Sequence, residues 1–211
     1  MKEKKIIGID FDDVLLNFND SLVEYHNANY GTTLARHDCV DFDLTNIWKC
    51  TGEENMRRIL EFYETEMHWN SPPVSEAQES VRKLRETHEL VVITSRPERL
   101  KEKTLKWLEN YFPNTFEHVF FTNQFSGSEN VVDKATACKR FKVNIFIDDH
   151  IDNAVNVADN GIDAYLFDTP WNQKAPEHPK ITRVFGWPDI LKKLTTSPIY
   201  ISQGKEEAEI L

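Results

Sequence analysis

Short, almost uninterrupted apolar runs recur along this chain, separated by segments with helical periodicity. The runs are Ile6–Ile9, Leu90–Ile93, Val119–Phe121, Ile145–Ile147 and Ala164–Phe167. None of them alternates polar with apolar residues, so each is predicted to be a strand covered on both faces. Strands that alternate with helices form a parallel sheet through right-handed crossovers. The predicted fold class is therefore α/β, with a Rossmann-like parallel sheet flanked by helices.

A long segment after the first strand interrupts this rhythm. It has helical character at Ser21–Asn29 and Glu53–Met67, an irregular stretch rich in Asp and aromatic residues between them, and Pro72-Pro73 at its end. An insertion at this point lies above the carboxyl end of the strand, where ligand crevices form in open α/β sheets. Three parts are therefore expected: an α/β core, a small helical cap and a C-terminal tail, formed by residues 1–16 and 74–194, residues 17–73 and residues 195–211.

Composition excludes several functional classes. The formal net charge of −10 disfavours binding to a nucleic-acid polymer and means that a phosphorylated substrate needs a local positive centre. Cys39, Cys50 and Cys138 form no CxxC pair, so a thiolate zinc site is not expected, and unpaired thiols favour the reducing cytoplasm. No apolar stretch has the length of a signal sequence core or a membrane span.

Carboxylates cluster at the end of the first predicted strand. Asp10, Asp12 and Asp13 follow Ile9 within four positions. Like charges this close cost free energy unless a cation or a raised pKa relieves them. A hard divalent cation that accepts carboxylate and carbonyl oxygens would offset the repulsion, although a solvated acidic turn could carry the same pattern. Asp13 is not expected to be a direct ligand.

Three further elements follow in chain order and favour the metal-site interpretation. A second strand ends in hydroxyls where a helix begins, which suits phosphate binding; a lysine opens a later helix; and another apolar strand ends in adjacent acids. These elements are Thr94-Ser95-Arg96, Lys134 and Asp148-Asp149. Two parallel strands that deliver acids to the same sheet edge are most simply explained by a divalent-metal site.

The order of these motifs resembles the haloacid dehalogenase superfamily. Asp-x-Asp-x-Val stands at 10–14, strand-Thr-Ser at 94–95, Lys at 134 and strand-Asp-Asp at 148–149. Within the superfamily the chain is similar to the 5′(3′)-deoxyribonucleotidase group of phosphatases, in its inserted helices and in the segment Tyr165–Asn172. The resemblance covers about residues 4–172 and implies a magnesium-dependent phosphatase that hydrolyses small phosphate monoesters, such as a nucleotide, through an aspartyl-phosphate.

The resemblance also implies roles for individual residues. Asp10 would be the nucleophile and Asp12 the general acid and base. Thr94, with Ser95, would hold the phosphoryl oxygens, and Lys134 would neutralise the phosphoryl group and Asp10. Asp12 argues for phosphate chemistry, because expulsion of a halide needs neither that acid nor a metal.

Magnesium is the implied cofactor. Asp10, the backbone carbonyl of Asp12, and Asp148 or Asp149 would bind it, with Asp149 favoured as the direct ligand. The superfamily often has a further Asp four residues after the metal-binding acid. This chain has Asn153 at that position, so its outer metal shell departs from the pattern.

The inserted segment leaves the substrate preference open. Its aromatic residues, Phe42, Trp48, Phe62, Tyr63 and Trp69, could stack on a nucleobase or pack the core of the cap itself. Arg96 is expected either to contact the phosphate or to be an exposed arginine at a helix start. His68 and His150 lie near the expected mouth and are predicted to face solvent.

Other functions remain compatible with the motifs. A sugar-phosphate phosphatase or a phosphotransferase of the same superfamily would use the same residues, and a catalytically silent binding protein could keep the fold. Every reactive position holds the residue type that catalysis needs, which favours an enzyme. The partner expected in each case is a small phosphorylated molecule, without a nucleic-acid polymer or a membrane, and the oligomeric state stays open.

Overall fold

A computed structural model describes residues 4–124 and 131–195, and contains a six-stranded parallel sheet. Most of the C-terminal tail predicted for residues 195–211 lies outside the described residues. The strand order is β3-β2-β1-β4-β5-β6, and every neighbouring pair is parallel. The strands are β1 (Ile6–Ile9), β2 (Glu89–Thr94), β3 (His118–Phe121), β4 (Ile145–Asp148), β5 (Asp163–Phe167) and β6 (Ile181–Val184). The predicted Rossmann-like α/β fold is confirmed.

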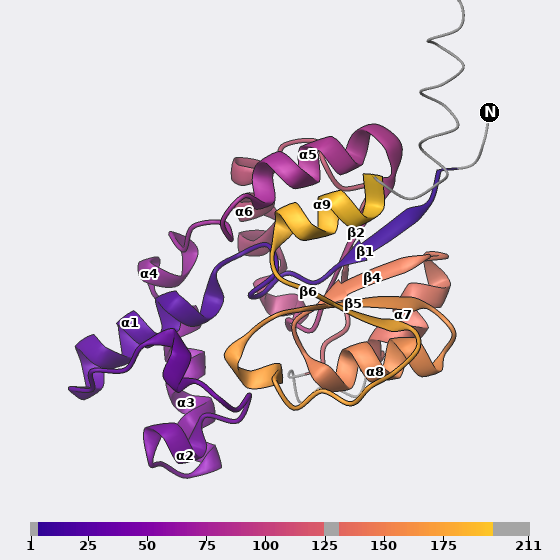
Figure 1. Ribbon diagram of the computed structural model, residues 1–211. Coiled ribbons are helices and arrows are strands. Elements are labelled where there is room, and N and C mark those ends of the chain that lie inside the picture. Colours follow the sequence, from indigo (N-terminus) through magenta and orange to yellow (C-terminus); the bar gives the residue numbers. More distant parts are fainter. Residues whose placement is uncertain (1–3, 125–130, 196–211) are drawn as a thin grey trace, which may run out of the picture.

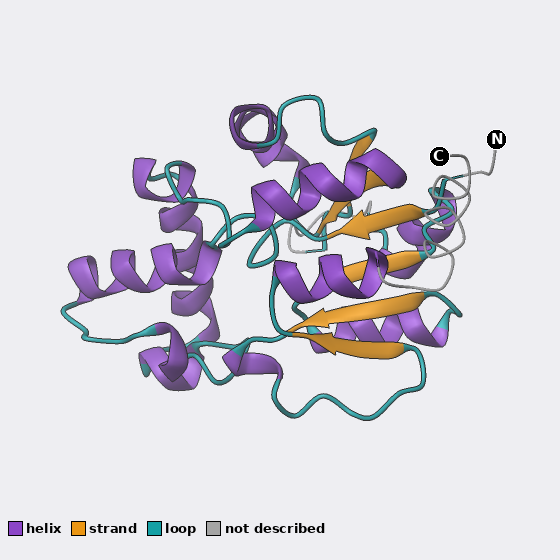
Figure 2. Ribbon diagram, turned by 45° about the horizontal axis from the view of Figure 1, so that its top comes forward, coloured by secondary structure: helices purple, strands orange, loops and turns teal. Residues whose placement is uncertain are grey.

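Helices cover both faces of the sheet (Figures 1 and 2). On one face α5 (Ala77–Thr87), α6 (Lys101–Tyr111) and α9 (Trp187–Thr195) pack on the alternate strand residues that include Ile7, Ile9 and Val92. On the other face α7 (Lys134–Arg140) and α8 (Ile151–Asp159) pack on a set that includes Val91 and Phe146. Because successive strand residues face opposite sides, continuous apolar runs are what this three-layer arrangement requires.

The helical insertion, residues 17–73, stands to one side of the sheet (Figure 1). It comprises α1 (Phe18–Tyr30), the 3₁₀ helix η1 (Arg36–Asp38), α2 (Thr45–Trp48), α3 (Gly52–Tyr63) and α4 (Glu66–Trp69). These helices enclose their own apolar cluster, which includes Leu22, Trp48 and Phe62.

The chain enters and leaves the helical insertion at adjacent points. The Asn17 N–H donates to the carbonyl oxygen of Pro72 at 3.0 Å, and the Val74 N–H donates to that of Leu15 at 2.8 Å. The insertion is therefore connected to the core by two chain segments that are hydrogen-bonded to each other just beyond the end of β1.

β6 was not among the predicted strands. Its sequence, Ile-Thr-Arg-Val, mixes polar with apolar residues because β6 is the outer strand of the sheet, and Thr182 is exposed. An edge strand is covered less completely than a central one, so it lacks the continuous apolar signal on which the prediction relied. Two short 3₁₀ helices, η2 (Glu98–Leu100) and η3 (Pro170–Asn172), complete the elements used below. Within the described residues, no helix has the length and hydropathy needed to cross a membrane.

Candidate active site

The acids that follow β1 and β4 meet at the carboxyl edge of the sheet. Ile9 pairs with Ile147 across these neighbouring strands, so Asp10 and Asp148, the next residue of each chain segment, lie level with each other. Carboxylate oxygens of Asp10, Asp148 and Asp149 all lie within 4.8 Å of one another, and all three residues are buried. The chain order reverses beside β1, which is where open α/β sheets form ligand sites.

Lys134 lies between two of these acids. It is the first residue of α7, and its Nζ atom is 2.8 Å from Asp10 Oδ1 and 2.6 Å from Asp148 Oδ2. The Asp133 side chain caps the same helix by accepting from the Thr136 N–H, which fixes the helix start and hence the lysine. Burial alone would lower the pKa of Lys134, but the two carboxylates outweigh it and raise that pKa, so the ammonium stays charged.

The carboxylates outnumber this single positive charge. Burial, with Asp148 and Asp12 nearby, raises the pKa of Asp10 to about 7, although Lys134 opposes the shift. Burial and the neighbouring acids also raise the pKa of Asp149 well above its ordinary value. Such shifts mark a buried excess of negative charge that a cation would relieve. An all-oxygen donor set of this kind fits a hard divalent ion such as Mg²⁺.

Asp149 is oriented by residues of η3 that were not predicted to belong to the site. The indole N–H of Trp171 donates to Asp149 Oδ2 at 2.8 Å, and the Asn172 amide donates to the Asp149 carbonyl oxygen at 2.8 Å. Both residues belong to the segment Tyr165–Asn172 whose resemblance to nucleotidases was noted. That resemblance was the available signal, but it carried no information about contacts.

Thr94, the last residue of β2, and the two residues after it take three different positions. Thr94 is fully buried, and its Oγ1 atom accepts from the Arg96 backbone N–H at 3.2 Å. Ser95 lines the cavity described below, and its hydroxyl donates to Gln124 Oε1 at 2.6 Å. Arg96 is only 2% exposed, so the alternative of an exposed arginine at a helix start is wrong.

Arg96 forms a two-pronged ion pair with Asp12. Its Nε atom donates to Asp12 Oδ2 at 2.8 Å, and its Nη2 atom donates to Oδ1 at 2.7 Å. The Asp12 side chain keeps 25% exposure toward the cavity, whereas that of Arg96 keeps 1%. Parallel N–H···O bonds of this kind hold a carboxylate in one plane. The structure thus places Asp12 beside the acidic cluster, with its carboxylate turned to Arg96.

The structure contradicts the prediction for one of the two histidines. His68 has no exposed surface, so its predicted orientation toward solvent is wrong, and burial together with Arg96 lowers its pKa to about 2. His150 is partly buried at the start of α8, where its ring packs edge-on against Phe42 with centroids 4.1 Å apart. His150 therefore joins the sheet edge to the helical insertion across the mouth of the site.

A cavity of about 400 Å³ lies between the helical insertion and the acidic cluster. Its floor is polar and includes Asp10, Asp12, Ser95, Arg96 and Asp149. Its walls come from the insertion and are mostly apolar: Phe18, Phe42, Met56, Ile59, Leu60 and Tyr63, together with the polar Asp43 and Asn55. A polar floor under apolar walls suits a ligand with one charged group and one apolar group.

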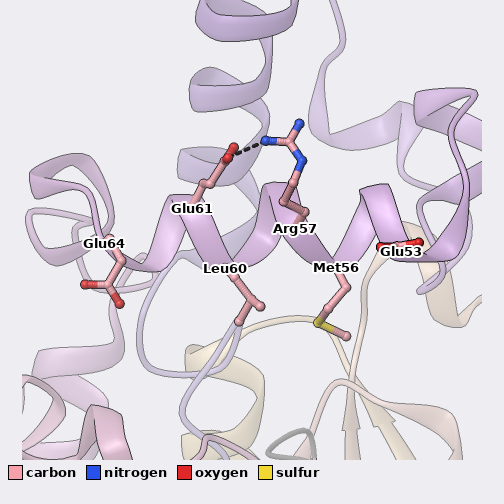
Figure 3. Close-up of a pocket in the computed structure, with 6 residues that line it drawn as sticks. All are labelled: Glu53, Met56, Arg57, Leu60, Glu61 and Glu64. Carbon is pink, nitrogen blue, oxygen red and sulfur yellow. Dashed lines mark hydrogen bonds and ion pairs between the residues drawn. The ribbon is translucent and has the colours of Figure 1, made fainter.

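Met56 and Leu60 also line a second hollow on α3, together with Glu53, Arg57, Glu61 and Glu64. Figure 3 shows the two apolar side chains leaving α3 on one side, while Arg57 and Glu61 form an ion pair on the other. The apolar face of α3 therefore extends from the cavity wall to the outer surface.

The aromatic residues of the insertion divide between two kinds of position. Trp48 and Phe62 are buried in the core of the insertion, whereas Phe42 and Tyr63 line the cavity. Trp69 packs near Arg96, with the guanidinium carbon 5.4 Å from its ring centroid. The sequence pattern could not separate these groups, because the neighbours of each ring come from other elements.

Arg36 was not predicted to lie near the site. It comes from η1 in the helical insertion, and its Nη1 atom is 2.8 Å from Asp13 Oδ1. The Asn19 N–H donates to the same oxygen at 3.1 Å, and the Arg36 guanidinium carbon lies 4.8 Å from the Trp171 ring centroid. Burial raises the pKa of Asp13 to about 6, although Arg36 opposes the shift. Asp13 therefore bonds to the insertion rather than to the acidic cluster.

Several solved structures share this architecture. A haloacid dehalogenase-like hydrolase, SP0104 from Streptococcus pneumoniae, matches with a TM-score of 0.68 at 12% identity, over 92% of this chain and 100% of that one. YfnB from Bacillus subtilis, described as bound to magnesium, matches with a TM-score of 0.57 at 14% identity, over 93% and 100%. The chain has the haloacid dehalogenase fold.

Sequence comparison defines the family within that superfamily. Residues 4–196 match the family described as "5′ nucleotidase, deoxy (Pyrimidine), cytosolic type C protein". The chain is 28% identical over 195 residues to a 5′(3′)-deoxyribonucleotidase of Bacillus subtilis, covering 90% of this chain and 99% of that protein. The chain belongs to this nucleotidase family and is a phosphoric monoester hydrolase.

Proposed function

We propose that this enzyme is a magnesium-dependent nucleotidase that hydrolyses nucleoside monophosphates through a phosphorylated Asp10. The observation that carries the proposal is the buried cluster of Asp10, Asp148 and Asp149 around Lys134, at the floor of a cavity with apolar walls. The proposed domains are the core, residues 1–16 and 74–194, and a cap, residues 17–73, that encloses the substrate.

Asp10, Asp149 and the backbone carbonyl of Asp12 would hold Mg²⁺, with Asp148 fixed behind them by Lys134. When bound, the ion would reduce the repulsion between a phosphate dianion and an attacking carboxylate. The Trp171 indole holds one oxygen of Asp149, which leaves the other for a ligand. These assignments are proposals that rest on the donor set and its geometry.

The protein side chains would divide the chemistry in two steps. Asp10 attacks phosphorus and the ester oxygen leaves, which gives an aspartyl-phosphate. Asp12 donates a proton to that leaving oxygen and then takes one from the water that hydrolyses the intermediate. Lys134, held between Asp10 and Asp148, keeps the nucleophile in place and offsets charge on the phosphoryl group.

Thr94 and Ser95 are proposed to donate to the phosphoryl oxygens. Ser95 lines the cavity, which supports its role, whereas Thr94 is fully buried beside it. The substrate-binding role predicted for Arg96 stays a prediction. Four of its N–H···acceptor contacts already go to Asp12, His68 and Thr104, which limits what it can offer a ligand.

The cavity walls support a nucleoside as the leaving group. Phe42, Met56 and Leu60 line the cavity and keep 50%, 41% and 37% of their surface exposed. A nucleobase offers the flat, weakly polar surface that would cover them. The family description and the deoxyribonucleotidase relative support deoxypyrimidine nucleotides as the first candidates.

The described cysteines support a reducing compartment. Cys39, Cys50 and Cys138 are all free thiols, and two of them are buried. Oxidising compartments favour disulfides, so we propose that the enzyme works in the cytoplasm.

Turnover measurements would test the proposed function directly. The wild-type enzyme is assayed on nucleoside 5′- and 3′-monophosphates, sugar phosphates and p-nitrophenyl phosphate, with Mg²⁺ and with EDTA. We expect nucleotides to be preferred and EDTA to abolish turnover. Asp10→Asn should lose at least a factor of about 10³, because no covalent step remains. The matched control Asp152→Asn changes an exposed carboxylate of α8 and should keep the wild-type rate. A wild-type rate in Asp10→Asn would refute the mechanism.

A further inference from the structure

Three side chains form a continuous chain of contacts from the acidic cluster into the helical insertion. Asp12 follows β1, Arg96 follows β2, and His68 belongs to α4 of the insertion. Arg96 Nη2 lies 2.7 Å from Asp12 Oδ1 and 3.1 Å from His68 Nε2, so one nitrogen serves both neighbours. We refer to these residues as the Asp12–Arg96–His68 chain.

Arg96 is held on all sides. Its third nitrogen, Nη1, donates to Thr104 Oγ1 of α6 at 3.1 Å. Its guanidinium carbon lies 4.3 Å from the ring centroid of Phe11 and 5.5 Å from that of Tyr63. A planar cation fixed by directional bonds and stacked rings has little rotamer freedom. The position of His68 can therefore determine, through Arg96, the orientation of the Asp12 carboxylate.

His68 acts as an acceptor in this chain. Burial and the positive charge of Arg96 lower its pKa to about 2, so the ring is neutral and Nε2 presents a lone pair to Arg96. The proton must then lie on Nδ1, a buried atom with no hydrogen-bond partner among the described residues. An unsatisfied buried donor carries a free-energy cost. An apolar ring would avoid that cost, so packing alone does not account for a histidine here.

The position of His68 is set by the insertion. Its ring packs edge-on against Phe62 and Tyr63 at centroid distances of 4.9 Å in each case. Its backbone N–H donates to the Thr65 side chain that caps α4. The ring is therefore packed within the insertion, and its Nε2 atom reaches the core through Arg96.

We infer that Arg96 and His68 are positioning residues for Asp12, through which the helical insertion sets the orientation of the acid that protonates the leaving oxygen. The inference rests on the proposed function, since it needs Asp12 to be that acid. Without the histidine, the guanidinium loses its hydrogen bond to α4, and its Nη2 atom is no longer fixed from the side of the insertion. The Asp12 carboxylate is then no longer held in the orientation in which it faces the cavity.

The test compares esters that differ in how much they need an acid. A p-nitrophenolate leaves readily without a proton, whereas the alkoxide of a nucleotide does not. His68→Phe keeps a flat ring but removes the acceptor. We expect its kcat/KM on thymidine 5′-monophosphate to fall roughly tenfold more than that on p-nitrophenyl phosphate, because a positioned acid is worth about 10²–10⁴ in rate. His68→Gln restores an acceptor and should bring the ratio of the two values back within about threefold of wild type.

His26 provides a matched control. It is also a buried histidine of the insertion whose Nε2 lies near an arginine, Nη1 of Arg58 at 2.9 Å, but it does not touch Arg96. His26→Phe should leave the ratio of the two kcat/KM values unchanged. Arg96→Lys keeps the charge but loses the paired N–H groups, and tests the same inference if His68→Phe does not fold. Unfolding temperatures of all variants are measured alongside.

The outcomes separate the inference from the function on which it rests. A selective loss on the nucleotide in His68→Phe, with recovery in His68→Gln, supports the inference. Equal losses on both esters, or no loss on either, show that His68 and Arg96 only stabilise the fold and overturn it. Wild-type enzyme that hydrolyses no nucleotide refutes the proposed function itself.

Discussion

Replacement of Lys134 by methionine would show how strongly the acidic cluster depends on the ammonium group of that lysine. Lys134 is 1% exposed and lies 2.6 Å from Asp148 and 2.8 Å from Asp10. Methionine has a similar length and suits the buried position, so the substitution removes the charge with little change in packing. Asp10 and Asp148 are then left buried without the ammonium group that contacts them in the metal-free protein.

The size of the effect follows from that imbalance. Removal of one partner from a buried ion pair costs about 3–5 kcal/mol, because the remaining charge stays desolvated. Here the two contacts involve two carboxylates, so we expect the upper part of that range in EDTA. For a protein of this size it corresponds to a fall of about 10 °C or more in the unfolding temperature. Mg²⁺ should restore part of the loss, because the cation replaces the missing positive charge.

Urea unfolding in EDTA, followed by circular dichroism, measures this difference. Lys139→Met is the matched control, since Lys139 lies on the same helix but is exposed, with Nζ bonded to Asn160 Oδ1. The control should change the free energy of unfolding by less than about 0.5 kcal/mol. If Lys134→Met is as stable as Lys139→Met in EDTA, the acids do not form the electrostatic cluster described above.

Two further predictions concern the metal site and the insertion. Trp171→Phe keeps the ring beside Arg36 but removes the donor to Asp149, so the Kd for Mg²⁺ measured by calorimetry should rise about 10–100-fold. An unchanged Kd would contradict the orienting role of the indole. Burial and Arg58 lower the pKa of His26 to about 4, so the unfolded state takes up its proton first as pH falls below about 6.5. Wild-type stability should therefore lose up to roughly 3 kcal/mol by about pH 4 through this group. His26→Phe lacks that loss. If urea unfolding shows the same difference in free energy of unfolding between wild type and His26→Phe at every pH in this range, the assignment is wrong.

The elements that carry the acids could be predicted from local pattern. Strands β1 and β4 are continuous apolar runs, and each ends where the first carboxylates begin. The alternation of such runs with helices implies a parallel sheet, and a parallel sheet brings all carboxyl ends to one edge. The meeting of Asp10 with Asp148 therefore followed from order and periodicity without knowledge of any contact. β6 was not predicted, because an edge strand needs no continuous apolar run.

The partners of the polar residues could not be predicted in this way. Arg96 and His68 are residue types that usually face water, and nothing in their neighbourhood along the chain signals burial. Asp12 and Arg96 are 84 positions apart, and His68 reaches Arg96 from a different element again. The contact requires the insertion to fold back over the sheet edge.

Periodicity along the chain determined which segments are strands or helices and which residues stand at strand ends, because those properties depend on a few neighbouring side chains. Only the tertiary structure decided which buried charges are neutralised and by which group, because that depends on atoms brought within about 3 Å from distant parts of the chain. The division is clearest at Asp12: its place after β1 could be read from the residues around it, whereas its pairing with Arg96 depended on packing.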